Sequence, residues 1–96
     1  MERTMIYANQ PLVIDLTLVE DISSLTLAVQ YWEPYNFTED YDGTITSISK
    51  VDANNISFTF PADTLNRPGV WRYQLLDTVN NTPWPTEFIK VLERGQ

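Results

Sequence analysis

The sequence contains no cysteine and no histidine. Without cysteine the chain forms neither disulfides nor a zinc–thiolate site, so its stability must come from packing and hydrogen bonds. Histidine is the commonest general base and cysteine a strong protein nucleophile, so Ser-His-Asp and Cys-His catalysis are excluded. The chain has only three glycines, and no glycine-rich loop is present to bind a phosphate or a dinucleotide. We therefore expect no enzymatic function and no cofactor.

Basic residues are also few, since 6 lysines and arginines face 13 acidic residues and leave a net charge of -7. An acidic surface repels the phosphate backbone, so we expect no binding to nucleic acid. No apolar run approaches the roughly 20 residues that cross a bilayer as a helix, so we expect no membrane insertion. The N-terminal Met1–Met5 lacks the apolar region of a signal peptide. We expect the protein to be made in the cytoplasm.

Hydrophobic residues make up 43% of the 96 residues and aromatics 12%, which is enough for one domain with its own core over residues 1–96. Apolar and polar residues alternate through most of the chain, as they do in strands with one buried face. Alternation marks Leu12–Leu18, Leu25–Tyr31, Ile56–Phe60 and Trp71–Leu75, and further strands are predicted at Met5–Tyr7, Thr44–Lys50 and Glu87–Leu92. The pattern predicts an all-β domain of about seven strands, as a sandwich or an open barrel.

The connections between these runs carry turn signals. We predict hairpin loops at Asp52–Asn55 and Asn80–Asn81, because asparagine tolerates positive φ. Trp84 lies between two prolines, which indicates an edge strand or a bulge. The one segment that favours a single helical turn is Ala62–Asn66.

The longest irregular stretch, Glu33–Asp42, is both acidic and aromatic. If the alternation before it places Tyr31 toward the core, Trp32 faces outward. Exposed rings here would form a hot spot for a protein partner or stack on a sugar. In the alternative, the loop rings fold back over the end of the sandwich. The contact candidates are Trp32, Tyr35, Phe37 and Tyr41.

The same loop concentrates the carboxylates Glu39, Asp40 and Asp42. Carboxylate oxygens suit calcium, but the spacing of an EF-hand loop is missing, so a solvated acidic loop is favoured over a calcium site. A pair of facing carboxylates would also serve a glycosidase-like enzyme. A structure that leaves all three solvated on one loop would count against that hypothesis.

Two stretches together carry a family resemblance. Residues Leu12–Trp32 read as a strand, a short polar link and a strand that ends in aromatics. The second stretch contains DGTI at 42–45, NISFTFP at 55–61 and LNRPGVWRY at 65–73, followed by a turn and a closing strand. This order resembles the immunoglobulin-like domains of tailed-phage structural proteins, especially the N-terminal domain of baseplate upper proteins. The inter-sheet disulfide of antibody domains is absent, and Trp71 stands where such folds place a corner tyrosine.

The resemblance implies an immunoglobulin-like antiparallel β-sandwich and a place in the virion, in the tail, the baseplate or a head decoration. Our first hypothesis is therefore a non-enzymatic phage structural protein that contacts other virion proteins or itself as a homo-oligomer. The alternative is a carbohydrate-binding module that uses the same aromatics as a monomer, on a host-surface glycan.

Overall fold

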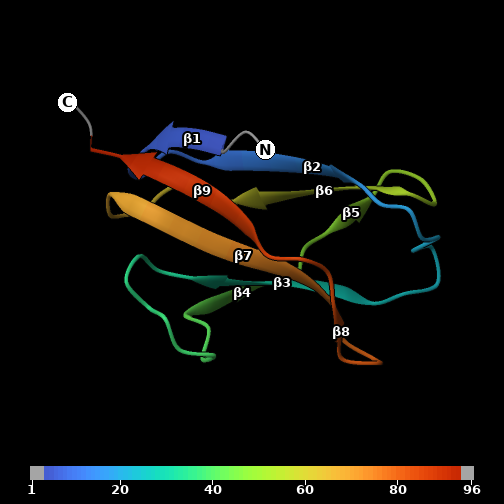
Figure 1. Ribbon diagram of the computed structural model, residues 1–96. Coiled ribbons are helices and arrows are strands. Elements are labelled where there is room, and N and C mark those ends of the chain that lie inside the picture. Colours follow the sequence, from blue (N-terminus) through green and yellow to red (C-terminus); the bar gives the residue numbers. More distant parts are fainter. Residues whose placement is uncertain (1–3, 94–96) are drawn as a thin grey trace.

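The alternating segments form strands in the computed structural model, which describes residues 4–93 (Figure 1). The predicted domain of residues 1–96 thus includes six terminal residues that lie outside the described part. The strands are β1 (Thr4–Tyr7), β2 (Leu12–Thr17), β3 (Leu27–Trp32), β4 (Gly43–Ile45), β5 (Ser49–Lys50), β6 (Asn55–Phe60), β7 (Gly69–Asp77), β8 (Thr82–Pro83) and β9 (Glu87–Leu92). Residues 4–93 contain no helix, so the predicted all-β class is confirmed.

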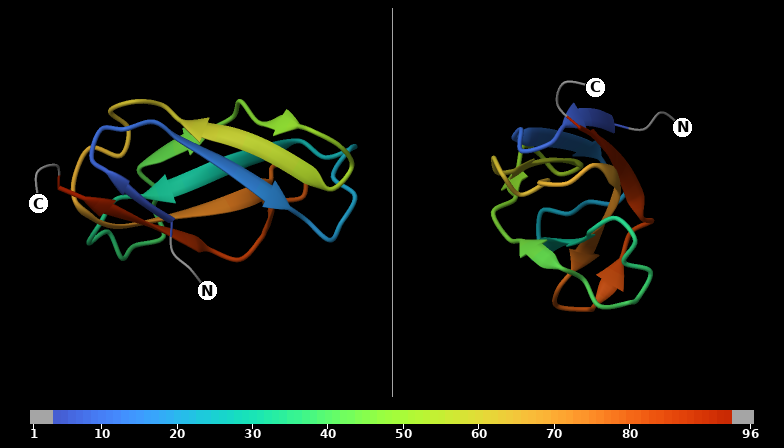
Figure 2. Two further views of the ribbon diagram at one scale, coloured as in Figure 1. Left: turned by 90° about the horizontal axis from the view of Figure 1, so that it is seen from above. Right: turned by 90° about the vertical axis from the view of Figure 1, so that its left-hand side faces the viewer.

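The strands form two sheets that pack face to face (Figure 2). The large sheet has the order β1-β9-β7-β3-β4, and β8 adds to the end of β7. The small sheet has the order β2-β6-β5. β1 runs parallel to β9, and the other pairs are antiparallel. The chain crosses from one sheet to the other between β1 and β2, so the first two strands lie in different layers.

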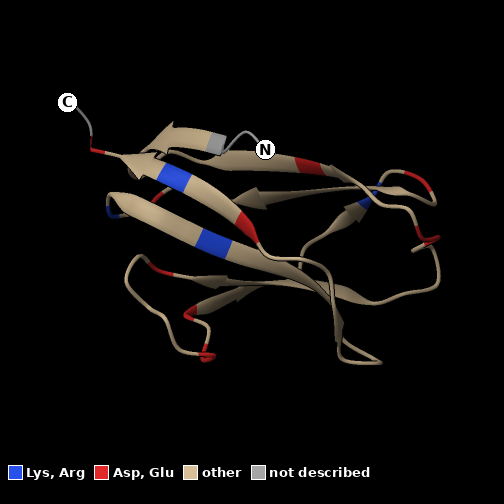
Figure 3. Cartoon of the chain, viewed as in Figure 1, with Lys and Arg blue, Asp and Glu red and all other residues tan. Residues whose placement is uncertain are grey.

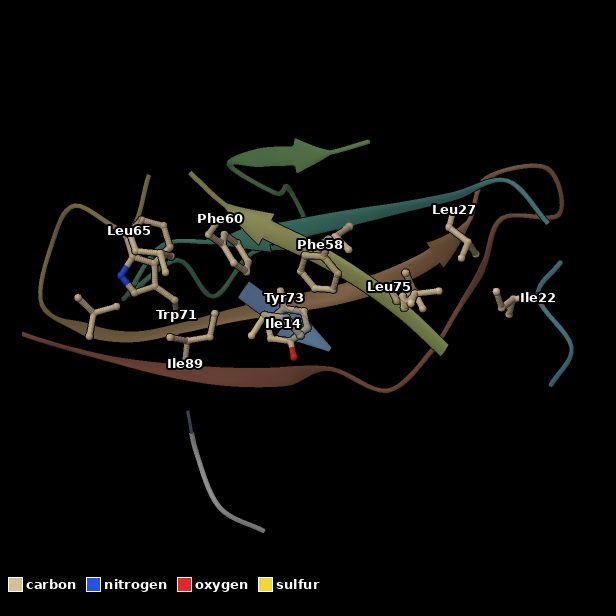
Figure 4. Close-up of a cluster of buried hydrophobic side chains, with 13 residues drawn as sticks. Ile14, Ile22, Leu27, Phe58, Phe60, Leu65, Trp71, Tyr73, Leu75 and Ile89 are labelled. Atoms are coloured by element: carbon tan, nitrogen blue, oxygen red, sulfur yellow. The ribbon is translucent and has the colours of Figure 1, made fainter. Parts of the chain in front are cut away.

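The core lies between the two sheets and is rich in aromatic rings (Figure 4). Phe58 and Phe60 of β6 meet Tyr73 of β7 edge-on, with ring centroids 5.7 and 5.9 Å apart. Edge-to-face pairs at this separation stabilise beyond the area that they bury. Trp71 and Ile89 on the large sheet are almost fully buried. The inward side chains of both sheets therefore close one core without a disulfide.

The single strand predicted over Thr44–Lys50 is wrong. The segment forms β4 in the large sheet and β5 in the small sheet, so the chain changes layers between them. Ile45 and Ile48 both pack against the core. Side chains three residues apart point to opposite faces of a straight strand, so the chain must bend for both to reach the core.

The two predicted hairpins form, but for different reasons. Asn81 connects β7 to β8 with a positive φ of 54°, as the sequence suggested. In the β5–β6 hairpin the Asp52 carboxylate accepts the N–H groups of Asn54 and Asn55, both at 2.9 Å. Those two asparagines do not have positive φ. Ala62–Asn66 contains a turn closed by the Thr64 N–H on the Pro61 carbonyl, at 3.2 Å, and no helix.

The start of β7 is fixed by a tryptophan corner. The Trp71 indole N–H donates to the Arg67 carbonyl, four residues earlier, at 2.9 Å. Gly69 lies within this corner at a φ of 134°, and a Cβ there would come within 2.7 Å of the Pro34 Cβ. Only glycine fits this backbone without strain.

Gly69→Ala is expected to lower the free energy of unfolding by about 1–3 kcal/mol, because alanine resists the positive φ and also clashes with Pro34. Urea denaturation would measure the change. Pro68→Ala, at the exposed neighbouring position, is the control and should cost less than about 1 kcal/mol. Equal stability of Gly69→Ala and the wild type would contradict the assignment of strain.

Candidate docking face

The outward surfaces of the two sheets differ in character. The small sheet mostly presents polar groups, including Asp15, Thr17 and Thr59, with Val13 as an exposed exception. This is the usual pattern for a sheet with one solvated face. The large sheet instead exposes apolar side chains on three strands. Their exposed fractions are 62% for Met5 and 41% for Tyr7 on β1, 39% for Val70 on β7 and 44% for Phe88 on β9.

A row of side chains crosses the centre of this outer surface. Arg72 of β7 stands in register with Trp32 of β3 on one side and with Phe88 of β9 on the other. The Arg72 guanidinium lies 4.4 Å from the centre of the Trp32 ring. A cation at this distance is attracted by the negative face of the indole. The sequence alone did not identify Arg72, because an arginine in an alternating strand reads as a solvated residue.

Trp32 faces away from the core cluster as predicted, but it is only 5% exposed. The prediction that it offers a surface contact is therefore wrong. Arg72 lies over one face of the ring, and the Tyr41 ring meets it edge-on at 6.4 Å. Tyr41 itself remains 49% exposed.

The segment of residues 33–42, called here the 33–42 loop, is built on hydrogen bonds. One oxygen of Asp42 accepts the Glu33 N–H at 2.7 Å and the Asn36 side-chain amide at 2.9 Å. Arg72 donates to the carbonyls of Asn36 and Thr38, at 3.1 and 2.7 Å. The loop is thus closed on itself by Asp42 and tied to the sheet by Arg72.

Tyr35 and Phe37 project from this fixed loop and are 82% and 87% exposed. These two rings therefore point into solvent and do not fold back over the end of the sandwich. Only the loop backbone lies against the sheet, through its bonds to Arg72. A groove of about 380 Å³ lies between the loop and the strands. Its lining residues are Glu33, Tyr35, Asn36, Phe37, Val70, Arg72, Thr86 and Phe88. We call this groove, with the outward residues of β1, β7 and β9, the docking face.

The carboxylates Glu39, Asp40 and Asp42 are all exposed on the one loop. Within residues 4–93 no group of three acidic side chains is arranged to hold a metal ion. Hydrogen bonds from the Glu33 N–H and the Asn36 amide hold the pKa of the Asp42 carboxyl below its ordinary value. Asp42 therefore acts as the charged acceptor that organises the loop.

The Asp42 carboxylate is expected to make loop stability depend on pH. Because its folded-state pKa is depressed, its contribution is present above the ordinary value of 3.8 and is lost as the pH falls through the lower folded value. Asp42→Asn should be less stable than the wild type at pH 7, and the difference should shrink toward about pH 2. Urea unfolding across this range measures it, with the exposed Asp15→Asn as the charge-matched control. A deficit that stays constant with pH would contradict the role of the charge.

Comparison of the chain with protein-family models, with curated proteins and with solved structures gives no match. The described residues include no helix that is long and apolar enough to cross a membrane. Function is therefore inferred from the chemistry of the docking face itself.

Proposed function

We propose that this chain is a non-enzymatic binding domain that assembles with protein through its docking face. The observation that carries the proposal is the pair of exposed rings, Tyr35 and Phe37, on a loop that Arg72 fixes to the sheet. Large aromatic side chains dominate the binding energy of protein interfaces. Exposed apolar groups that gather beside a groove mark a contact surface more often than scattered single residues do.

The fixed loop strengthens this proposal. A mobile loop must be ordered on binding, and that ordering opposes association. Here the hydrogen bonds of Asp42 and Arg72 order the loop before a partner arrives. Tyr35 also holds a positive φ of 69°. Such backbone strain in a residue other than glycine is found most often at binding and active sites.

We further propose that the fold is an immunoglobulin-like sandwich. The order β2-β6-β5 in one sheet and β9-β7-β3-β4 in the other agrees with the B-E-D and G-F-C-C′ orders of such domains. The indole bond from Trp71 to the Arg67 carbonyl agrees with the tyrosine corner, which ties the start of strand F to the backbone upstream.

The resemblance to tailed-phage domains gives the proposed setting, a virion part made in the host cytoplasm and placed in the tail, the baseplate or a head decoration. The exposed position of Glu39, Asp40 and Asp42 on a single loop supports a role without catalysis, because glycosidase carboxylates flank the bond that they cleave. The burial of Trp32 removes the largest ring from any sugar-stacking platform, so the observations favour a protein partner over a glycan.

Photo-crosslinking tests the docking face directly. p-Benzoylphenylalanine would replace Phe37 on the docking face and, as the control, the exposed Thr59 on the small sheet. In the cells or particles that contain the protein, we expect a discrete protein adduct from position 37 and none from position 59. Absence of any adduct at position 37 would overturn the proposal. A glycan array in which wild type binds a sugar and Phe37→Ser does not would replace it with the carbohydrate-binding alternative.

A further inference from the structure

Basic residues lie on β7 and β9, and several acidic residues lie in the connection between β3 and β4 (Figure 3). Lys90 on β9 is exposed, and the acidic 33–42 loop leaves β3, the strand on the other side of β7. Val70 and Arg72 on β7 lie between them, and Phe88 lies two residues from Lys90 on β9. Lys90 stands in register with Val70 and with Met5, so its ammonium group rises from the exposed apolar strip. Across the face the order is therefore Met5, Lys90, the β7 pair of Val70 and Arg72, and the acidic loop.

This order is self-complementary under a two-fold axis. In an isologous interface the same patch serves both subunits, and a residue that contacts a second one is contacted by it in return. A two-fold axis through the groove places Lys90 of the first copy against the acidic loop of the second. By symmetry, Lys90 of the second copy then lies against the acidic loop of the first. The same rotation lays the Phe37 ring of each copy over the Val70 and Phe88 wall of the other.

We infer that the occupant of the docking face is the same face of a second copy of this chain, in a two-fold dimer. This inference rests on the proposed function and names its partner. The Cα atoms extend over 43 × 27 × 24 Å, so a broad face has room for the roughly 800 Å² that each partner buries in a standard interface. The described basic residues are Lys50, Arg67, Arg72 and Lys90, and two of them lie on this face.

The inference has an electrostatic consequence. Each copy carries a net charge of -7, so the overall repulsion opposes association and must be offset by local pairing and apolar burial. Salt screens long-range repulsion between exposed charges more than it weakens apolar contacts. The dimer is therefore expected to strengthen, or to stay unchanged, when salt rises from low to physiological concentration.

Light scattering and sedimentation over a concentration series test the dimer. The wild type should approach twice its 11.1 kDa mass as the concentration rises. Phe37→Ser should weaken association by about tenfold or more, and it should keep its melting temperature because the ring is 87% exposed. Val13→Ser is the matched control. Val13 is 59% exposed on the opposite face, so this substitution should leave association unchanged.

A charge swap tests the predicted pairing. Lys90→Glu should weaken the dimer by about tenfold, because it places like charges across the axis. Combining it with Asp40→Lys keeps the net charge at its original value and should restore association. Failure of the double variant to recover would overturn this arrangement of the two copies.

The outcomes separate this inference from the function on which it rests. A monomer at every concentration, with a position-37 crosslink to a different protein, overturns the second copy and leaves the docking face in place. A position-37 crosslinked product of twice the chain mass supports both the docking face and the second copy as its occupant. A closed trimer or larger ring overturns the two-fold arrangement, and a dimer insensitive to Phe37→Ser overturns the face as its interface.

Discussion

Replacing Arg72 with methionine is expected to release the 33–42 loop from the sheet while the two sheets stay folded. The guanidinium donates to the carbonyls of Asn36 and Thr38 and lies over the Trp32 ring. Hydrogen bonds from a charged donor contribute about 1.5–3 kcal/mol, and a cation over an indole adds about 0.5–2 kcal/mol. Because Arg72 is only half-buried, we expect a loss of about 2–3 kcal/mol in the free energy of unfolding.

Hydrogen exchange distinguishes loop release from general loss of stability. In Arg72→Met the amides of residues 33–42 should exchange much faster, while those of β6 and β7 should change only in proportion to global stability. Lys90→Met is the control, because it removes the other cation of the same face without a contact to the loop backbone. It should cost less than about 0.5 kcal/mol in the monomer, as exposed substitutions do. Loop amides that stay protected in Arg72→Met would show that Asp42 alone orders the loop.

The Arg72 contact shows what the sequence could not predict. Trp32 and Arg72 lie in different strands, and only the register of β3 against β7 brings them together. Period-two alternation assigns Trp32 to the outer surface, which is correct, but it carries no information on what covers that surface. A contact that depends on how two distant strands pair cannot be predicted from a local sequence pattern. The error on the exposure of Trp32 follows directly.

Other features were accessible from local chemistry. Three predicted strands agree closely with β2, β6 and β9, and the run Trp71–Leu75 covers the middle of β7, because one face of each strand is buried. Tyr35 and Phe37 could be singled out from their place in the longest loop, and the structure leaves both rings exposed. The split of β4 from β5 was missed, although Ile45 and Ile48 are three residues apart and so break the period-two pattern where the chain changes sheets.

The charge of the loop had two local interpretations, a solvated surface or a calcium site. Its actual arrangement depends on Asn36, which bridges the Asp40 carbonyl and the Asp42 carboxylate at 3.0 and 2.9 Å. This amide takes the Asp40 carbonyl and one oxygen of the Asp42 carboxylate as its acceptors. A count of acidic residues could not reveal this, since the deciding side chain is uncharged.

Trp71→Ala is expected to be the most destabilising single substitution considered for the described residues. The side chain is 1% exposed and lies beside Tyr31, with ring centroids 6.2 Å apart. Removing a buried tryptophan costs about 3–5 kcal/mol through lost burial and the cavity left behind. Domains of this size have roughly 5–15 kcal/mol of stability in total. Denaturant unfolding followed by circular dichroism should show a much lower midpoint, or a chain that is partly unfolded without denaturant.

Trp71→Phe separates the hydrogen bond of the corner from the packing of the ring. Phenylalanine keeps most of the apolar volume but cannot donate to the Arg67 carbonyl, so we expect a loss of about 1–2 kcal/mol. Trp84→Ala is the matched tryptophan control. Its indole also donates, to Glu20 at 3.1 Å, but the ring is only partly buried and the bond is exposed. If Trp71→Phe were as stable as the wild type, the corner would be a packing feature alone. Because the bond links the start of β7 to the turn before it, its loss should also loosen Gly69 and the neighbouring Val70, which lines the groove of the docking face.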